Sequence, residues 1–388
     1  MHREKDTHDS WIAQEFEHLY DEVQILEETE EFTDEERLKK AVPALLSWFG
    51  RHARVLPWRE EPTPYRVWIS EIMLQQTRVE AVKPYFERFL QAFPSVEALA
   101  AAEEDRLLKM WEGLGYYNRA RNLQRAAKEI LDRYDGKMPG DYAELQTLPG
   151  IGSYTAGAVS SIAFGRKVPA VDGNVLRVIS RVTASRKDIT DVATKKQMEA
   201  LLLNVMPEKT PGEFNQALME VGATVCIPRG EPLCGECPFE SLCLAGRHKL
   251  TGEIPVKKAQ KARRVEQRTI LLFHDGERVF VRKRPAKGLL AGLYEFPNET
   301  SWLTEQEIKE RAKRMTAGWQ DITFAGDATH IFSHVEWHMK GYLIRVPKGS
   351  IPVEFAADVG QLKTQKAIPN AFILYTRKIM GILEKNEK

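Results

Sequence analysis

The four cysteines of this chain all lie within one short stretch. They are Cys226, Cys234, Cys237 and Cys243, so seven, two and five residues separate them. Disulfides staple small secreted domains, whereas a long chain with a single cluster of thiols is typical of metal binding in a reducing compartment. The stretch 226–243 is therefore predicted to fold around a metal centre.

The spacing of these thiols bears on which metal they bind. Structural zinc sites usually take their four cysteines as two close pairs, and only Cys234 and Cys237 form such a pair here. Four unevenly spaced cysteines in one loop are typical of an iron–sulfur cluster. The spacing favours an iron–sulfur cluster, with zinc as the alternative.

Charge is unevenly distributed along the 388 residues. Residues 1–40 hold 14 Asp or Glu against 5 Lys or Arg, while the remainder holds 41 against 51. The basic body suits a polyanionic partner such as nucleic acid, and the acidic N-terminal extension, residues 1–37, is expected to be solvated. Without a signal peptide or an apolar run of membrane-spanning length, we expect a soluble, cytoplasmic protein with no membrane partner.

The hydrophobic periodicity predicts two folded domains. Apolar residues three and four apart, as in 42–49, 67–74, 79–93 and 107–111, predict an all-α domain over 38–250. A basic linker follows at 251–265, of which 257–264 is expected to be an exposed connector. Residues 266–388 predict a smaller α+β domain, with strands at 269–273, 278–284, 322–324 and 341–346, a turn at 274–277, and helices at 305–315 and 371–383.

A glycine-rich segment, 148–157, is interpreted as the hairpin of a helix–hairpin–helix. Gly150 and Gly152 bracket an isoleucine and precede a helix of small residues. Glycines let the backbone approach a DNA phosphate, and N–H groups at a helix N-terminus can hold it. The alternative is an ordinary glycine-rich connection between helices.

Two acidic residues are candidates for chemistry. Glu71 lies among apolar neighbours on the predicted helix 67–74, where burial would raise its pKa and keep it protonated. Asp172 follows an apolar pair and precedes another helix, so its role could be simply that of an N-cap. The sequence keeps both the catalytic and the structural interpretation of Asp172 open.

Taken together, these motifs resemble the adenine DNA glycosylase (MutY) family of the endonuclease III superfamily. The resemblance covers about residues 38–380 and is carried by the hairpin, the cysteine loop, 56–59, 70–77, 111–117 and 171–175. It implies a multi-domain protein: an all-α helix–hairpin–helix glycosylase domain with an iron–sulfur cluster loop, then an α+β Nudix-like domain. It also implies a [4Fe–4S] cluster and a monomer that acts in base excision repair on bacterial nucleoid DNA with adenine opposite 8-oxoguanine or guanine.

The resemblance assigns roles to the catalytic residues. Glu71 would protonate adenine at N7, and Asp172, ionised by polar neighbours and a helix N-terminus, would stabilise the oxocarbenium-like sugar. Asn174 would orient Asp172. Tyr154 stands where lyase-competent relatives carry a lysine, and a phenol cannot form an imine, so we expect a monofunctional glycosylase with at most weak strand cleavage.

The resemblance also assigns base-recognition residues. The flipped adenine would be lined by Leu56, Trp58, Arg59 and Gln216. The opposite 8-oxoguanine would be probed by Gln76 and Tyr116 and read by Phe332, Ser333 and His334. For Trp58 and Tyr116 the alternative is core packing. The segment 305–315 lacks the glutamate pattern of a working Nudix hydrolase, so the second domain is expected to be a recognition module.

The sequence departs from the family at one spacing. Seven residues separate Cys226 from Cys234, where the family has six, and Gly230 is expected to absorb the extra residue.

Two other functions stay open. One is an endonuclease III-like glycosylase and lyase for oxidised pyrimidines, which Tyr154 disfavours, and the other is a catalytically silent DNA-binding protein, which the presence of both carboxylates disfavours.

Overall fold

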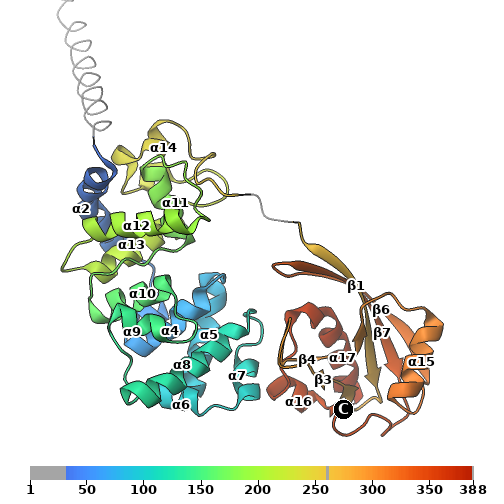
Figure 1. Cartoon of the computed structure of the whole chain (residues 1–388). Helices are drawn as coiled ribbons and strands as arrows, with labels where there is room; N and C mark the ends of the chain where they lie inside the picture. The colour runs from blue at the N-terminus through green and yellow to red at the C-terminus, as the bar shows by residue number, and fades with distance from the viewer. Residues whose placement is uncertain (1–31, 259–261, 387–388) are drawn as a thin grey trace, which may run out of the picture. The chain divides into compact units, whose positions relative to one another are not determined.

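A computed structural model describes residues 32–258 and 262–386 of the chain. The acidic extension falls largely outside the described residues. The fold divides into two compact units (Figure 1): unit 1 is Met1–Glu71 with Met138–Ala259, and unit 2 is Ile72–Lys137 with Gln260–Lys388. Among the described residues, no helix has both the length and the apolar character that crossing a bilayer requires.

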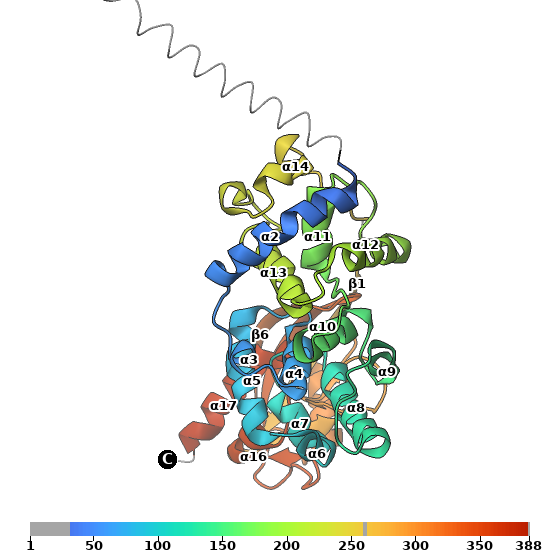
Figure 2. The ribbon, with the colours of Figure 1, turned by 90° about the vertical axis from the view of Figure 1, so that its left-hand side faces the viewer.

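Unit 1 is helical. Its helices are α2 (Asp34–His52), α3 (Pro57–Glu60), most of α4 (Pro64–Leu74), α9 (Tyr142–Thr147), α10 (Ser153–Phe164), α11 (Gly173–Val182), α12 (Val192–Val205), α13 (Pro211–Thr224) and α14 (Leu244–Arg247), with short 3-10 turns η1 (Cys234–Glu236) and η2 (Glu240–Leu242). The capping box of Thr33 and Glu36 starts α2 at Asp34. Helix α13 packs against α2, α10 and α11, and Figure 2 shows α2 alongside α13. The core of unit 1 forms where these helices meet.

The hairpin between α9 and α10 has the predicted form. Asp141 caps α9, and α10 begins at Ser153 after the exposed Gly152. Gly150 has a φ of +78°, a left-handed conformation that glycine adopts without strain, and Ile151 is buried beneath the turn. The backbone at the start of α10 is therefore open to solvent.

Unit 2 contains four helices from the first half of the chain, together with the C-terminal segment Gln260–Lys388. The helices are α5 (Val79–Ala92), α6 (Val96–Ala100), α7 (Glu104–Met110) and α8 (Asn118–Tyr134). Helix α8 buries one face, which includes Leu123, Ala127 and Ile130, and packs against α6 and α7. Most of its polar residues lie on the opposite face, as expected of an amphipathic helix, but Arg119 and Gln124 are buried.

The C-terminal part of unit 2 is built on a mixed sheet. Its elements are β1 (Arg264–His274), β2 (Val279–Phe280), β3 (Arg282–Lys283), β4 (Tyr294–Glu295), β5 (Asn298–Glu299), α15 (Glu305–Met315), β6 (Asp321–Ile331), β7 (Val335–Arg345), β8 (Ala356–Ala357), α16 (Val359–Thr364), η3 (Asn370–Phe372) and α17 (Ile373–Asn386). The strand order is β6-β7-β1-β2-β8, with β1 parallel to β7 and β5 also paired with β1. The predicted order of a helical part followed by an α+β part is confirmed.

Helices cover both faces of this sheet. Ile270 and Leu272 of β1 pack in a core with α17, while Leu271 and Phe273 pack with α15 on the opposite face (Figure 1). A strand covered on both faces has a continuous apolar run instead of alternation, which explains the sequence of β1.

The sequence predicted several strands imperfectly. The predicted strand 278–284 is wrong as a single element, because β2 pairs with β1 while β3 pairs with β4 in a separate two-stranded sheet. The strands predicted at 322–324 and 341–346 are parts of the longer β6 and β7, which form an antiparallel hairpin. The turn of that hairpin is Phe332-Ser333-His334.

Candidate functional site

Glu71 lies on α4 and is buried, with 5% of its surface exposed. The Tyr154 hydroxyl, from the first turn of α10, donates a hydrogen bond of 2.5 Å to Glu71 Oε2. Burial raises the pKa of Glu71 to about 7; the Tyr154 hydrogen bond opposes the shift and the nearby Asp172 adds to it. The carboxyl is therefore a group that can both hold and release a proton near neutral pH.

Asp172 is the N-cap of α11. Its Oδ1 accepts hydrogen bonds from the backbone N–H groups of Asn174 (2.9 Å) and Val175 (2.8 Å), and its Oδ2 accepts one from Asn174 Nδ2 (2.8 Å). Burial nevertheless raises the pKa of Asp172 above its ordinary value, although these hydrogen bonds oppose the shift. The sequence-based expectation was an Asp172 kept ionised by polar neighbours and the helix terminus; these groups do favour the carboxylate, and burial acts against them.

Asn174 connects Asp172 to the cysteine loop. Its Oδ1 accepts a hydrogen bond of 2.9 Å from Arg177 Nη2, and Arg177 Nε donates to the carbonyl of Cys226 (2.8 Å). A Cβ added to Gly222 would lie 2.6 Å from Asn174 Cβ, so glycine lets α13 approach this network closely. One turn of α11 thus fixes the carboxylate relative to the loop.

The predicted base-pocket residues of unit 1 fall into two groups. Leu56 and Trp58 are buried at the start of α3. Arg59 donates from Nε to Gln216 Oε1 (3.0 Å) and from Nη2 to Glu220 Oε2 (2.8 Å), so Arg59 and Gln216 are brought together.

Glu220 itself was missed by the sequence-based prediction. It is 1% exposed and accepts hydrogen bonds from both Arg54 and Arg59. Burial opposes its ionisation, but the two arginines lower the pKa of Glu220 below its ordinary value. The signal that identified Glu71, an acid among apolar neighbours on a helix, applies to Glu220 as well.

All four cysteines line one small cavity in unit 1, together with Arg181. Arg181 Nη1 donates to Cys226 Sγ (3.3 Å), and the backbone N–H of Gly246 donates to Cys243 Sγ (3.4 Å). Burial raises the pKa of the Cys237 thiol to about 12, so a positively charged metal group is needed to make it a thiolate. Within residues 32–258 and 262–386 no three His, Cys, Asp or Glu side chains are grouped to hold a metal ion, but the four thiols that line this cavity are the ligand type that an iron–sulfur cluster takes.

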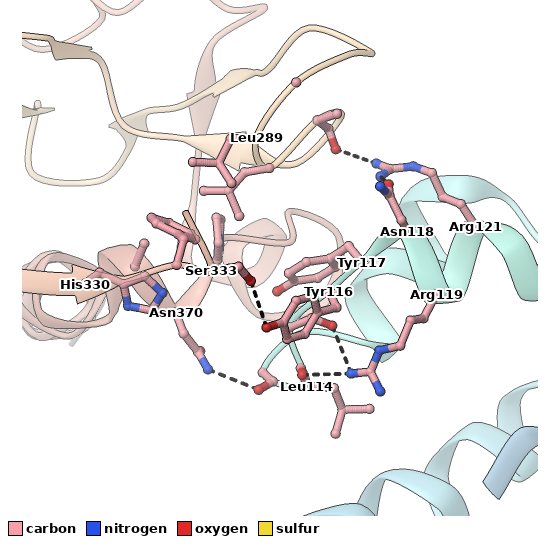
Figure 3. A pocket seen from close by; sticks show the side chains of 18 of the residues that line it. Leu114, Tyr116, Tyr117, Asn118, Arg119, Arg121, Leu289, His330, Ser333 and Asn370 are labelled. Carbon is pink, nitrogen blue, oxygen red and sulfur yellow. Dashed lines mark hydrogen bonds between the residues drawn. The ribbon is translucent and has the colours of Figure 1, made fainter. Parts of the chain in front are cut away.

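In unit 2 the residues predicted to read the opposite base meet at a cavity of about 760 Å³ (Figure 3). Tyr116, Phe332, Ser333 and His334 line it, and the Tyr116 hydroxyl is 3.1 Å from Ser333 Oγ. Gln76 is exposed and is not part of the lining. The structure therefore brings four of these five residues together.

The cavity also has lining residues that the sequence did not indicate. His330 packs edge-on against Phe332, with ring centroids 4.6 Å apart, and Asn370 Nδ2 donates to the carbonyl of Gly113 (3.1 Å). Leu289 and Leu290 add an apolar wall. His330 lies two residues before Phe332, near the end of β6, and this spacing is the sequence signal that could have indicated it.

Comparison with known proteins places these sites in a family. Residues 69–208 match the model of the HhH-GPD superfamily of base excision DNA repair proteins, and residues 268–372 match the NUDIX domain. The chain is 33% identical to the adenine DNA glycosylase of Homo sapiens, over 85% of this chain and 71% of that protein. It is also 33% identical to that of Buchnera aphidicola subsp. Acyrthosiphon pisum, over 78% and 86%.

A solved structure agrees with the helical fold. A thermostable thymine-DNA glycosylase superposes with a TM-score of 0.50 at 30% identity, over 55% of this chain and 97% of that one. All three of these proteins are named as DNA glycosylases. These matches show that the chain is a DNA glycosylase and belongs to the adenine DNA glycosylase family.

Proposed function

We propose that this enzyme hydrolyses the N-glycosidic bond of adenine opposite 8-oxoguanine or guanine in duplex DNA, as a step of base excision repair. The observation that carries the proposal is the buried Glu71 carboxyl, whose pKa of about 7 makes a proton available near neutral pH. A purine leaves poorly as an anion, so a protonated carboxyl in the pocket suits its removal. The relatives named adenine DNA glycosylase support adenine as the base.

The two carboxyl groups divide the reaction between them. Glu71 transfers its proton to adenine N7, the C1′–N9 bond breaks with its electron pair moving to the base, and positive charge develops on the sugar. Asp172, fixed by its hydrogen bonds to Asn174 and Val175, stabilises that charge as a carboxylate. Water then adds to C1′ and gives up a proton, which ionised Glu71 can accept, leaving adenine and an abasic site.

Tyr154 supports a monofunctional enzyme. Its hydroxyl donates to Glu71, whereas a lyase needs an amine here to form an imine with C1′. We therefore propose that the product is an intact abasic strand. This distinguishes the proposal from an oxidised-pyrimidine glycosylase and lyase.

Before hydrolysis the adenine must leave the base stack. We propose that Leu56, Trp58, Arg59 and Gln216 line the pocket that receives it. The contact between Arg59 and Gln216 supports this, because the pair presents polar groups beside a buried apolar wall. Glu220 pairs with Arg59 and thereby fixes the polar groups beside that apolar wall.

The opposite base is proposed to be recognised in unit 2. Tyr116 is 51% exposed and its hydroxyl contacts Ser333 at the mouth of the cavity, which supports a site where an aromatic ring stacks while hydroxyl groups read a base edge. Phe332, Ser333 and His334 would complete this site. Exposed Gln76 would probe the same base from the turn after α4.

Two further parts of unit 1 are proposed to support DNA binding. The open backbone at Gly150 and Gly152, at the N-terminus of α10, suits a phosphate contact. Cys226, Cys234, Cys237 and Cys243 would hold a [4Fe–4S] cluster that cross-links the loop 226–243 structurally. Gly230, with a φ of +78°, supports the proposal that the longer loop is accommodated without strain.

The proposal is tested by single-turnover excision from three duplexes that place adenine opposite 8-oxoguanine, guanine or thymine. We expect excision from the first two and none from the third. Asp172→Asn is the matched variant, because asparagine caps a helix as well as aspartate but carries no charge. Equal excision from all three duplexes would contradict the proposed specificity, and full activity of Asp172→Asn would contradict the proposed chemistry.

A further inference from the structure

The buried Arg119 of unit 2 has an unusual set of partners. It lies in the first turn of α8 and is 9% exposed. Its two terminal nitrogens donate to six oxygens in two segments of chain: the carbonyls of Ile72, Met73 and Gln75 and the Thr77 hydroxyl in one, and the carbonyls of Leu114 and Gly115 in the other. A single guanidinium therefore joins two turns far apart in sequence.

The first turn is the C-terminal end of α4. The last carbonyls of a helix lack partners within the helix and carry the negative end of its dipole, so a cation is favoured there. Arg119 Nη1 accordingly donates to Ile72 O (2.7 Å), Met73 O (3.0 Å) and Gln75 O (2.7 Å). The next residue, Gln76, has a φ of +57°, a left-handed conformation that is strained for a residue with a side chain.

The second turn leads into α8 and carries Tyr116. Arg119 Nη2 donates to Leu114 O (3.0 Å) and Gly115 O (3.2 Å), as Figure 3 shows. Tyr116 has a φ of +47°, and its ring centroid lies 5.9 Å from the guanidinium carbon. Both residues that would probe the opposite base thus adopt strained conformations beside carbonyls that Arg119 holds.

Only a guanidinium can make this arrangement. Its planar fork directs several N–H groups at fixed angles, whereas a lysine ammonium offers three donors from one point. Lys at this position would keep the charge and still reach one turn. It would lose the simultaneous contact with both.

We propose that Arg119 is a positioning residue that holds the turns of Gln76 and Tyr116 in one pre-formed geometry, so that discrimination of the opposite base depends on it. The inference rests on the proposed function, because it takes Gln76 and Tyr116 as the residues that probe that base. Arg119 acts through them, from a buried position, and needs no contact with DNA.

The test compares the full-length Arg119→Lys variant with wild type in two ways. The first is the ratio of kcat/KM for adenine opposite 8-oxoguanine over adenine opposite guanine, measured also for Tyr116→Ala and for the double variant. We expect Arg119→Lys to lower this ratio about tenfold, and the double variant to lower it by less than the product of the two single effects, because residues that act as one unit are not additive. An unchanged ratio, or additive effects, would overturn the proposal.

The second measurement is amide hydrogen exchange without DNA. We expect faster exchange in Arg119→Lys in both segments, 75–77 and 113–116, with β1 unchanged. Acceleration in only one segment, or in neither, would overturn the proposal. Arg37→Lys is the matched control, since Arg37 is also buried and donates to the carbonyls of Phe32 and Leu242 in unit 1; it should lower Tm and leave the ratio unchanged.

The two measurements separate this inference from the proposed function. A wild-type enzyme that excises adenine equally opposite 8-oxoguanine and guanine would contradict the role of Arg119 in discrimination and leave the proposed excision standing, whereas equal excision opposite thymine as well would contradict the proposed function. The exchange data do not involve DNA. Faster exchange in both turns would therefore still support the inference that Arg119 holds both turns, and unchanged exchange would overturn that inference.

Discussion

Replacing Tyr154 with phenylalanine removes the hydrogen bond of 2.5 Å to Glu71 and leaves the rest of the site in place. That hydrogen bond stabilises the ionised carboxylate and lowers the pKa of Glu71, against the effect of burial. A hydrogen bond to a charged group is worth about 1.5–3 kcal/mol, and one pKa unit corresponds to about 1.4 kcal/mol. Tyr154→Phe is therefore expected to raise the pKa of Glu71 by about 1–2 units.

The assay is the pH dependence of kcat/KM for adenine excision, which reports the pKa values of the free enzyme. The proposed reaction needs protonated Glu71, so the wild-type rate should fall as the pH rises through about 7. In Tyr154→Phe that basic limb should move to a pH of about 8–9. Tyr134→Phe, which changes an exposed tyrosine hydroxyl on α8, is the control and should leave the profile unchanged.

A basic limb that stays in place in Tyr154→Phe, or that moves to lower pH, would refute this reasoning. Glu71→Gln should lose its activity, and with it the basic limb of the pH profile. Full activity of Glu71→Gln at every pH would refute the assignment of Glu71 as the acid.

Three further predictions concern stability, recognition and the cluster. Because burial raises the pKa of Glu71 from 4.5 to about 7, the folded state binds more protons than the unfolded state between these values, and the free energy of unfolding falls as the pH rises through this window. Glu71→Gln should therefore be more stable than wild type at pH 8, by up to about 3 kcal/mol in denaturant unfolding, and a loss of stability there would contradict the burial argument. Replacing Ser333 and His334 together with alanine should reduce the preference for 8-oxoguanine over guanine about tenfold, from the loss of one to two hydrogen bonds, with excision opposite guanine as the internal control. Cys237→Ser should lower the iron content and the Tm, and unchanged iron per chain would exclude Cys237 as a ligand.

The parts of the site that could be predicted from sequence are those with a local pattern. Glu71 is an acid in an apolar helical segment, Asp172 precedes a helix, and the cysteines are close together in the chain. Each of these leaves a signal within a stretch of at most 18 residues. The same holds for the helix Glu305–Met315 and for the β-rich start of the C-terminal part.

What could not be predicted depends on contacts between distant segments. Arg119 meets carbonyls 44–47 residues away, and a carbonyl carries no sequence signal, so nothing indicated its role. The direction of the pKa shift of Asp172 depends on burial by other elements, which local polarity cannot reveal. The length of β6 was underestimated because its residues are largely exposed at the edge of the sheet.

The most direct test of the account is single-turnover reaction with a duplex that contains adenine opposite 8-oxoguanine, analysed with and without alkali. The account predicts strand cleavage at the adenine only after alkali, which marks an intact abasic site made by a monofunctional glycosylase with Tyr154 at the hairpin. Tight binding without product would instead indicate a silent DNA-binding protein. Cleavage without alkali at an oxidised pyrimidine in a parallel duplex would contradict the account in favour of a lyase.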